Sequence, residues 1–173
     1  MTTLKELTKT SHELAEAHPF TKHLISGNIE DDVYATLLAN QLLQYKYLED
    51  AAKHIFDTLP GLARADLILQ DLAELDAPVF IYDVTNNYCD YVQTLNDHDL
   101  LAHIYVKHMG DLYGGQLIRT KVPGNGLMYL FSDRQLIIQQ LRAKLDVSMA
   151  DEANKCFDMT LNLFDRIADE YDL

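Results

Sequence analysis

One histidine near the start of the chain lies among residues that can assist a metal ligand. Glu16 follows His12 by four residues and Lys5 precedes it by seven, so all three share one face of a helix. A carboxylate one turn away can accept a hydrogen bond from the imidazole Nδ1–H, which leaves Nε2 free for a metal. Lys5 adds a cation that can hold a carboxylate of the same ligand. The same spacing also fits an ordinary ion pair on a helix surface.

A cluster of glycines is the second candidate site. Three of the seven glycines, Gly110, Gly114 and Gly115, fall within a stretch that otherwise reads as helix, where each costs about 1 kcal/mol relative to alanine. Gly110 and Gly114 are four residues apart and therefore bare one face of the backbone. Either another helix crosses closely there, or a flat ligand such as a porphyrin lies against it. Asp111 adjoins this face, where it can order water over a bound metal.

Two other kinds of metal site are disfavoured by the positions of histidine and cysteine. No histidine has Asp or Glu three residues before it, so the Glu-x-x-His pairs of di-iron bundles are absent. Cys89 and Cys156 are far apart and form no zinc-type or redox spacing. We expect two free thiols in a reducing cytoplasm.

Helical runs separated by turn residues must position these groups. Thr3 and Glu6 fit a capping box that opens a helix reaching about Ala17, with Leu7 and Leu14 on its apolar stripe. No segment alternates with a period of two for long enough to form a sheet. We predict a single all-α domain over residues 1–173, a bundle of about seven or eight helices. The further helical runs are 18–27, 28–60, 63–75, 84–95, 98–120, 132–146 and 149–173.

Charge and hydropathy exclude several partners. The formal charge is −13, which disfavours binding to nucleic acid or to an anionic membrane surface. No apolar run approaches the length of a membrane-spanning helix, and the first residues lack the apolar core of a signal peptide. We therefore expect a cytoplasmic protein with no nucleic-acid or membrane partner.

Taken together, the two motifs make the sequence resemble the heme oxygenases, particularly the short ferredoxin-dependent forms of photosynthetic systems and their phages. The family pattern T-K-x-x-H-x-x-A-E matches residues 8–16, and G-D-L-x-G-G-Q matches residues 110–116. Residues 151–167 resemble the last long helix of the family. The resemblance spans nearly the whole chain.

The resemblance implies a site for heme b, which is both cofactor and substrate, between a proximal helix and a kinked distal helix. His12 would be the axial iron ligand and Glu16 would orient it. Asp111 would hold a distal water network, while Gly110 and Gly114 would let the backbone touch the heme face. The implied contacts to the cofactor and its propionates are Lys5, Tyr105, Lys107 and Arg142.

The implied reaction uses dioxygen and electrons from reduced ferredoxin to cleave heme at the α-meso position. Its products are biliverdin, carbon monoxide and ferrous iron, and the biliverdin can feed phycobilin synthesis. Plant-type ferredoxins are acidic, so a chain of net charge −13 needs a local basic patch to bind one. We expect that patch to consist of Lys5, Lys9, Arg119, Lys121, Arg142 and Lys144.

Several positions depart from the family pattern. Ile138 stands where a lysine commonly helps to hold a propionate, and Thr160 where an asparagine often supports the distal water network. Tyr113 replaces a small residue of the glycine motif. Lys107 stands where the family often has arginine, and His108 where it often has tyrosine, which makes His108 an alternative second iron ligand.

Two other functions are alternatives. A thiaminase-like enzyme shares this kind of all-α fold but needs a nucleophilic cysteine, and neither Cys89 nor Cys156 has an evident base in the sequence. A non-enzymatic heme-binding or helical interaction protein would bind heme without degrading it. In that protein Asp111 would have no special role.

Overall fold

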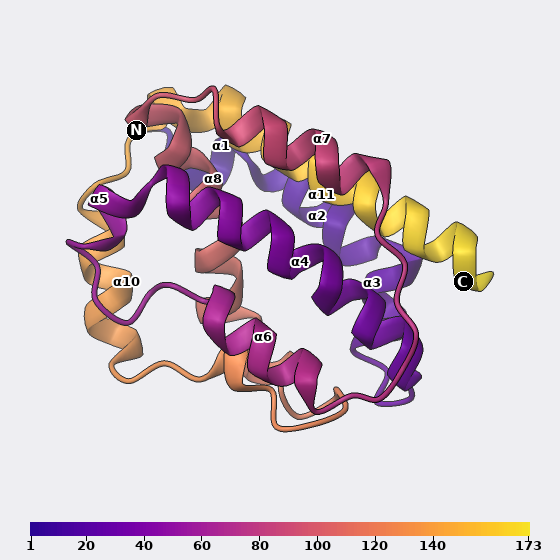
Figure 1. Ribbon diagram of the computed structural model, residues 1–173. Helices are drawn as coiled ribbons and strands as arrows, with labels where there is room; N and C mark the ends of the chain where they lie inside the picture. The colour runs from indigo at the N-terminus through magenta and orange to yellow at the C-terminus, as the bar shows by residue number, and fades with distance from the viewer.

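Helix α8 (Asp97–Tyr113) runs through the middle of the structure, where it contacts α4 (Asp31–Ala51) and α11 (Ala150–Tyr171). The computed structural model describes all of residues 1–173. In Figure 1, α4 crosses in front of α8, and α11 runs along one edge of the molecule to the C-terminus. The other helices are α1 (Leu4–Leu7), α2 (Lys9–Ala17), α3 (Pro19–Leu24), α5 (Lys53–Phe56), α6 (Ala65–Ala73), α7 (Asp83–Val92), α9 (Gly115–Ile118) and α10 (Arg134–Arg142), with 3-10 turns η1 (Leu127–Tyr129) and η2 (Val147–Met149).

The predicted all-α class is confirmed, but several predicted helices are divided. The structure has 11 α-helices and no strand. The run 28–60 breaks at Ala52 into α4 and α5, and the run 98–120 breaks at Gly114 into α8 and α9. Segment 77–82 belongs to no helix and no strand. The divisions explain why about seven or eight predicted helices become eleven.

The N-terminal helix shows a larger difference from prediction. The capping box between Thr3 and Glu6 is confirmed. The helix then breaks at Thr8, whose hydroxyl donates back to the Leu4 carbonyl at 3.0 Å. Leu7 and Leu14 do not form the expected buried stripe, because they are 44% and 57% exposed. Helix α2 contains no buried residue and rests mainly on α11 and α3.

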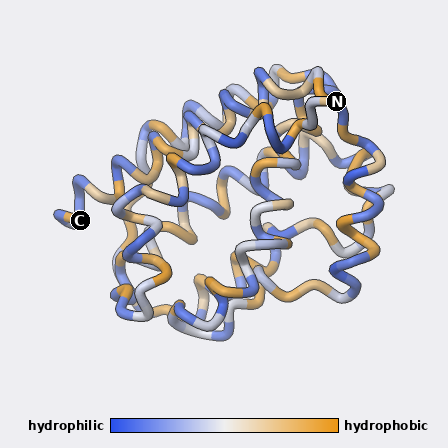
Figure 2. The backbone as a smooth tube through the Cα atoms, turned by 180° about the vertical axis from the view of Figure 1, so that it is seen from behind, coloured by the Kyte–Doolittle hydropathy of each residue, from blue (hydrophilic) through white to orange (hydrophobic).

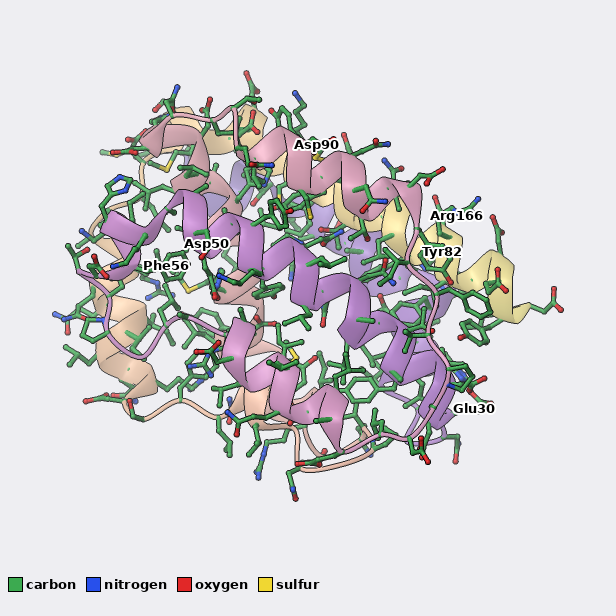
Figure 3. All side chains as sticks on the ribbon, in the orientation of Figure 1. Glu30, Asp50, Phe56, Tyr82, Asp90 and Arg166 are labelled. Carbon is green, nitrogen blue, oxygen red and sulfur yellow. The ribbon has the colours of Figure 1, made fainter.

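Apolar side chains form two main clusters, and the residues of α8 belong to the first of them. One joins α8 to α5, α7 and α10, and the other joins α3, α4, α6, η1 and α11. Figure 2 shows hydrophobic and hydrophilic residues alternating along the helices, as amphipathic packing requires. Figure 3 labels Tyr82 and Arg166, where the Arg166 guanidinium of α11 lies 5.5 Å from the ring centroid at the start of α7. None of the helices combines the length and apolar character that a membrane-spanning segment requires.

Candidate functional site

A cavity of about 860 Å³ separates the N-terminal helices from α8 and α9. Its volume lies in the range typical of sites for small molecules and cofactors. Helices α1 and α2 form one wall, and α8 and α9 form the opposite wall. The cavity therefore brings together the two motifs that are about 100 residues apart in the sequence. Most of the predicted site residues line it, namely Lys5, His12, Glu16, Tyr105, Gly110, Gly114 and Arg142.

The wall formed by α2 presents His12. Its side chain is 57% exposed, and its ring meets the Phe157 ring edge-on at a centroid distance of 6.0 Å. The expected hydrogen bond from Nδ1–H to Glu16 is not made, because Nε2 is the nitrogen near Glu16, at 3.6 Å from Oε1. Both side chains are more than half exposed, and an exposed pair of this kind fixes ring orientation only weakly.

The opposite wall shows that the glycines of the motif have different roles. A Cβ atom on Gly110 would meet nothing within 4 Å, whereas one on Gly115 would overlap the Tyr129 ring. A Cβ on Gly114 would lie 3.2 Å from the Gly110 carbonyl oxygen, at the point where α8 ends. Gly115 therefore serves close packing within the protein. Gly110 instead leaves the α8 backbone open to the cavity.

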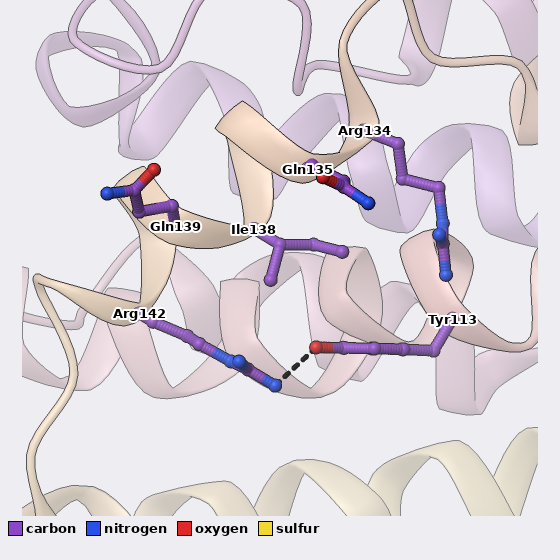
Figure 4. Close-up of a pocket in the computed structure, with 6 residues that line it drawn as sticks. All are labelled: Tyr113, Arg134, Gln135, Ile138, Gln139 and Arg142. Carbon is purple, nitrogen blue, oxygen red and sulfur yellow. Dashed lines mark hydrogen bonds between the residues drawn. The ribbon is translucent and has the colours of Figure 1, made fainter.

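Cationic and hydroxyl groups surround the mouth of the cavity. The Tyr105 hydroxyl lies 3.3 Å from Thr8 Oγ1 and so joins α8 to the junction of α1 and α2. Lys5 and Arg142 also line the cavity, and the Arg142 guanidinium donates to the Tyr113 hydroxyl (Figure 4). Such a rim suits a ligand with an apolar body and carboxylates at its edge.

Asp111 lies behind the α8 wall, and its side chain points toward α4. It is 8% exposed and accepts a 2.6 Å hydrogen bond from the Tyr45 hydroxyl. Burial raises the pKa of Asp111 to about 7, although the Tyr45 hydrogen bond and the charges of Arg64 and Lys107 oppose that shift. The carboxyl can therefore hold or release a proton near neutral pH, next to the residue that opens the cavity.

Behind α8, Glu49 is the centre of a group of polar contacts that the sequence did not indicate. Glu49 of α4 accepts hydrogen bonds from the backbone N–H groups of Arg64 and Ala65 and pairs with His108 Nε2 at 3.1 Å. Burial alone would raise the pKa of Glu49, but these hydrogen bonds hold it below its usual value. The members come from three separate segments, so no local spacing connects them.

Two predicted contacts are corrected by the structure. Lys107 does not line the cavity, because it lies two residues from Tyr105 and so on the other side of α8. Its Nζ donates to Gln44 Oε1 at 2.9 Å within the core, and burial lowers its pKa. His108 also faces the core, between the rings of Tyr45 and Phe56. Neither side chain is placed to touch a ligand in the cavity.

Both cysteines are free, as expected, and Cys156 has polar neighbours. Burial raises the pKa of the Cys156 thiol, but His103, Lys107 and Tyr88 together outweigh this effect, so the net shift is downward. His103 is a neighbour that the sequence did not indicate, but its two ring nitrogens pair with the Tyr88 hydroxyl and with Glu152. The thiol is nevertheless fully buried and does not line the cavity that contains His12. This arrangement offers a nucleophile no access to a substrate.

Comparison with known proteins agrees with these motifs and this fold. The family model of heme oxygenase matches residues 1–166. The chain is similar to heme oxygenase 2 of Rattus norvegicus, at 27% identity over 95% of this chain and 64% of that protein, so it spans less than two thirds of that relative. It is 28% identical to heme oxygenase 1 of Synechocystis sp., covering 95% of this chain and 82% of that protein.

Solved structures show the same fold. The structure of heme oxygenase-2 from Synechocystis sp. in complex with heme and NO superposes with a TM-score of 0.81 at 27% identity, covering 96% of this chain and 84% of that chain. The match of the family model extends over nearly all of the sequence, including both cavity walls. The chain belongs to the heme oxygenase family.

Proposed function

We propose that this protein is a heme oxygenase that binds heme b in the larger cavity and converts it to biliverdin, carbon monoxide and ferrous iron. The observation that carries the proposal is the pairing of His12 on one wall with the bare backbone at Gly110 on the other. An imidazole facing an open backbone surface suits a flat metal-bearing ring. Relatives and solved structures that bear the name heme oxygenase support the same activity.

The residues of the cavity fit heme in three respects. His12 would supply a ring nitrogen to the iron, and Glu16 lies near its Nε2 at 3.6 Å. Gly110 leaves room for the ring face, and Phe157 adds an apolar surface. When bound, heme supplies both the iron at which dioxygen is reduced and the ring carbon that is oxidised.

The protein's own contribution is to hold the substrate and to manage protons. Lys5, Tyr105 and Arg142 bind the carboxylate edge and set the rotation of the ring within the cavity. Asp111, held by Tyr45, orders water next to Gly110 and exchanges a proton with it. A carboxyl with a pKa of about 7 can do so at neutral pH without acting as a strong acid.

The finer aspects of the proposal concern the electron donor, the cleaved carbon and the location. We propose reduced ferredoxin as the donor, cleavage at the α-meso carbon, and biliverdin as a precursor of phycobilins. Lys121 and Lys144 lie within three residues of the cavity-lining Ile118 and Leu145, which would put positive charge beside the ligand edge. Two free, buried cysteines are compatible with action in the cytoplasm.

One spectroscopic experiment tests the function. Hemin is added to the protein, a reductant follows in air, and the absorption spectrum is recorded. We expect a Soret band that bleaches to the spectrum of biliverdin. A Soret band that persists would identify a heme-binding protein without the activity. If no Soret band forms, heme binding itself is disproved.

A further inference from the structure

Three titratable residues form a row along the buried side of α8. His103, Lys107 and Asp111 follow one another at intervals of four residues, so their side chains lie one turn apart on one face of the helix. All three are buried. The opposite side of the helix, with Tyr105 and Gly110, lines the larger cavity. The row therefore runs along α8 behind the cavity and ends at Asp111, next to Gly110.

The first member of the row connects to the surface between α7 and α11, two helices that lie side by side in Figure 1. His103 Nε2 lies 2.7 Å from Glu152 Oε1, and His103 Nδ1 lies 2.9 Å from the Tyr88 hydroxyl. Glu152 also accepts a 2.6 Å hydrogen bond from the Tyr91 hydroxyl, and its side chain is 15% exposed. A proton can therefore pass from solvent at Glu152 to the buried imidazole, and from there to Tyr88.

The second member of the row lies between the two tyrosines that contact the other members. Lys107 Nζ lies 4.6 Å from the centroid of the Tyr88 ring and 5.5 Å from that of the Tyr45 ring. Tyr88 is the partner of His103, and the Tyr45 hydroxyl donates to Asp111 at 2.6 Å. The three members and the two tyrosines thus form one chain of polar groups from the surface of the protein to Asp111.

Burial and charge suit the groups of this chain to pass a proton. Lys107 Nζ has one hydrogen-bond acceptor in the protein, Gln44 Oε1, for its three N–H donors. Burial lowers the pKa of Lys107, so its ammonium releases a proton more readily than in water. Burial also acts to lower the pKa of His103, but Cys156 and Glu152 outweigh it, so the net shift is upward. The imidazole therefore takes up a proton more readily than in water.

We propose that this row carries protons from solvent to Asp111 through the interior of the protein, with Glu152 as the entry point. The inference rests on the proposed function and deepens it. Reduction of dioxygen consumes protons, and a heme in the cavity would cover the side of α8 that faces the cavity. A route behind the helix would remain open while the substrate is bound. His103, Lys107 and Glu152 act through Asp111 and touch no ligand in the cavity.

Each step of the route moves one proton and returns every group to its starting state. Asp111 gives a proton to the water that it orders. The Tyr45 hydroxyl then passes its proton to Asp111 and takes one from Lys107, whose flexible stem lets the ammonium approach either tyrosine. His103 restores the Lys107 ammonium through the Tyr88 hydroxyl in the same way. The imidazole recovers its proton from solvent at the surface end of the row.

The other titratable groups packed against the row lie outside this chain. Glu49 of α4 pairs with His108, but His108 Nδ1 has no hydrogen-bond partner in the protein, so that contact leads no further. The remaining neighbours are Cys89 and Tyr91 of α7, Lys155 and Cys156 of α11, and Arg64. The variants below leave all of them in place.

The test follows proton release from Asp111 in protein that is loaded with hemin but given no reductant, so that no turnover occurs. The protonated carboxyl has an infrared C=O band, which Asp111→Asn identifies by removing it. After a jump from about pH 5 to about pH 9, decay of the band gives the rate of release, because the pKa of Asp111 is about 7. Lys107→Met and Glu152→Gln should each slow the decay by about a hundredfold, the lower end of what a positioned proton-transfer group contributes.

The equilibrium titration of the same band separates transfer from a structural role. In Glu152→Gln the midpoint should stay near that of the wild type while the rate falls, because Glu152 lies at the far end of the row from Asp111. Asp151→Asn changes the exposed neighbour of Glu152, which makes no hydrogen bond to the row. It should alter neither the rate nor the midpoint. A shifted midpoint with an unchanged rate in Glu152→Gln would overturn the role of Glu152 as the entry point.

Unchanged decay in both variants would overturn the proposal, because protons would then reach Asp111 from the cavity side. If Lys107→Met fails to fold, Glu152→Gln decides alone, since its side chain is partly exposed. A wild type that forms no complex with hemin would instead disprove the proposed function on which the inference rests.

Discussion

The Tyr45 hydroxyl of α4 donates a 2.6 Å hydrogen bond to Asp111 on the buried side of α8, one residue from Gly110 on the cavity side. The bond holds one carboxylate oxygen in place beside Gly110. Burial raises the pKa of Asp111 to about 7, so the group is poised to exchange a proton at neutral pH.

Replacing Asp111 by Ala should leave heme binding intact but slow biliverdin formation by about a hundredfold, the range of a lost acid–base group. The reason is that Asp111 does not line the cavity yet controls the proton beside it. Single-turnover spectra give the rate, and the Soret titration gives the affinity. Asp50→Ala, at an exposed site on α4, serves as the control. Normal turnover in Asp111→Ala would contradict the assigned role.

The pKa of Asp111 also predicts a dependence of stability on pH. The folded carboxyl keeps its proton to about pH 7, whereas the ordinary value is 3.8. Between these values the folded state binds more protons than the unfolded state, so stability falls as pH rises through this window. Asp111→Asn removes the titrating carboxyl and therefore this loss of stability at higher pH. We expect its melting temperature to exceed that of the wild type by roughly 4 °C or more at pH 8, with a smaller difference at pH 5. If the melting temperatures of the two proteins change with pH in parallel, the raised pKa of Asp111 is disproved.

The two types of glycine should respond oppositely to alanine. Gly110→Ala should stabilise the protein without ligand by about 1 kcal/mol, because the methyl group meets nothing and helix propensity improves. It should also weaken hemin binding, since the methyl group enters the cavity. Gly115→Ala should destabilise by about 1–3 kcal/mol through overlap with Tyr129. Thermal melting and hemin titration distinguish Gly110→Ala from Gly115→Ala. Equal effects of the two substitutions would disprove the different roles assigned to the two glycines.

Removal of His12 tests the proposed ligand. In His12→Ala the iron–imidazole stretch in the resonance Raman spectrum should disappear, and added imidazole should restore it. The matched control is His54→Ala, because His54 is also exposed and paired with a carboxylate, Asp97, but lies outside the cavity. An unchanged stretch in His12→Ala would show that another residue binds the iron.

Charge reversal tests the proposed docking of an acidic ferredoxin. Lys121→Glu combined with Lys144→Glu should reduce ferredoxin-driven turnover about tenfold at low salt, with a smaller loss at high salt. Turnover with a small chemical reductant should not change. Lys53→Glu on α5, which is remote from the cavity, is the control. Unaltered ferredoxin-driven rates would remove these lysines from the docking surface.

The sequence predicted the elements better than it predicted how they are divided and which way they face. Periodicity and caps identified the helical runs because those signals are local. The break at Thr8 depends on a hydroxyl that bonds back to its own turn, and no spacing signals it. Lys107 was misplaced because a motif match gives a residue's position but not the side of the helix on which it lies.

The sequence predicted those residues of the site that belong to one of two contiguous motifs. His12 and Gly110 are part of such motifs, and the structure places both in one cavity. Tyr45 and Glu49 act through partners distant in the sequence, Asp111 and His108, so only the folded chain brings them into contact. Their roles depend on burial, which the sequence does not display.

Helix α2 carries the proposed iron ligand, yet none of its own residues is buried. A ligand in the cavity would therefore be a main partner of this helix, together with α11 and α3. If that ligand is the substrate, each catalytic cycle removes one of the surfaces that hold α2 in place. Between cycles residues 9–17 would be more open to proteases than when the ligand is bound. The lifetime of the protein in a cell would then follow the supply of heme.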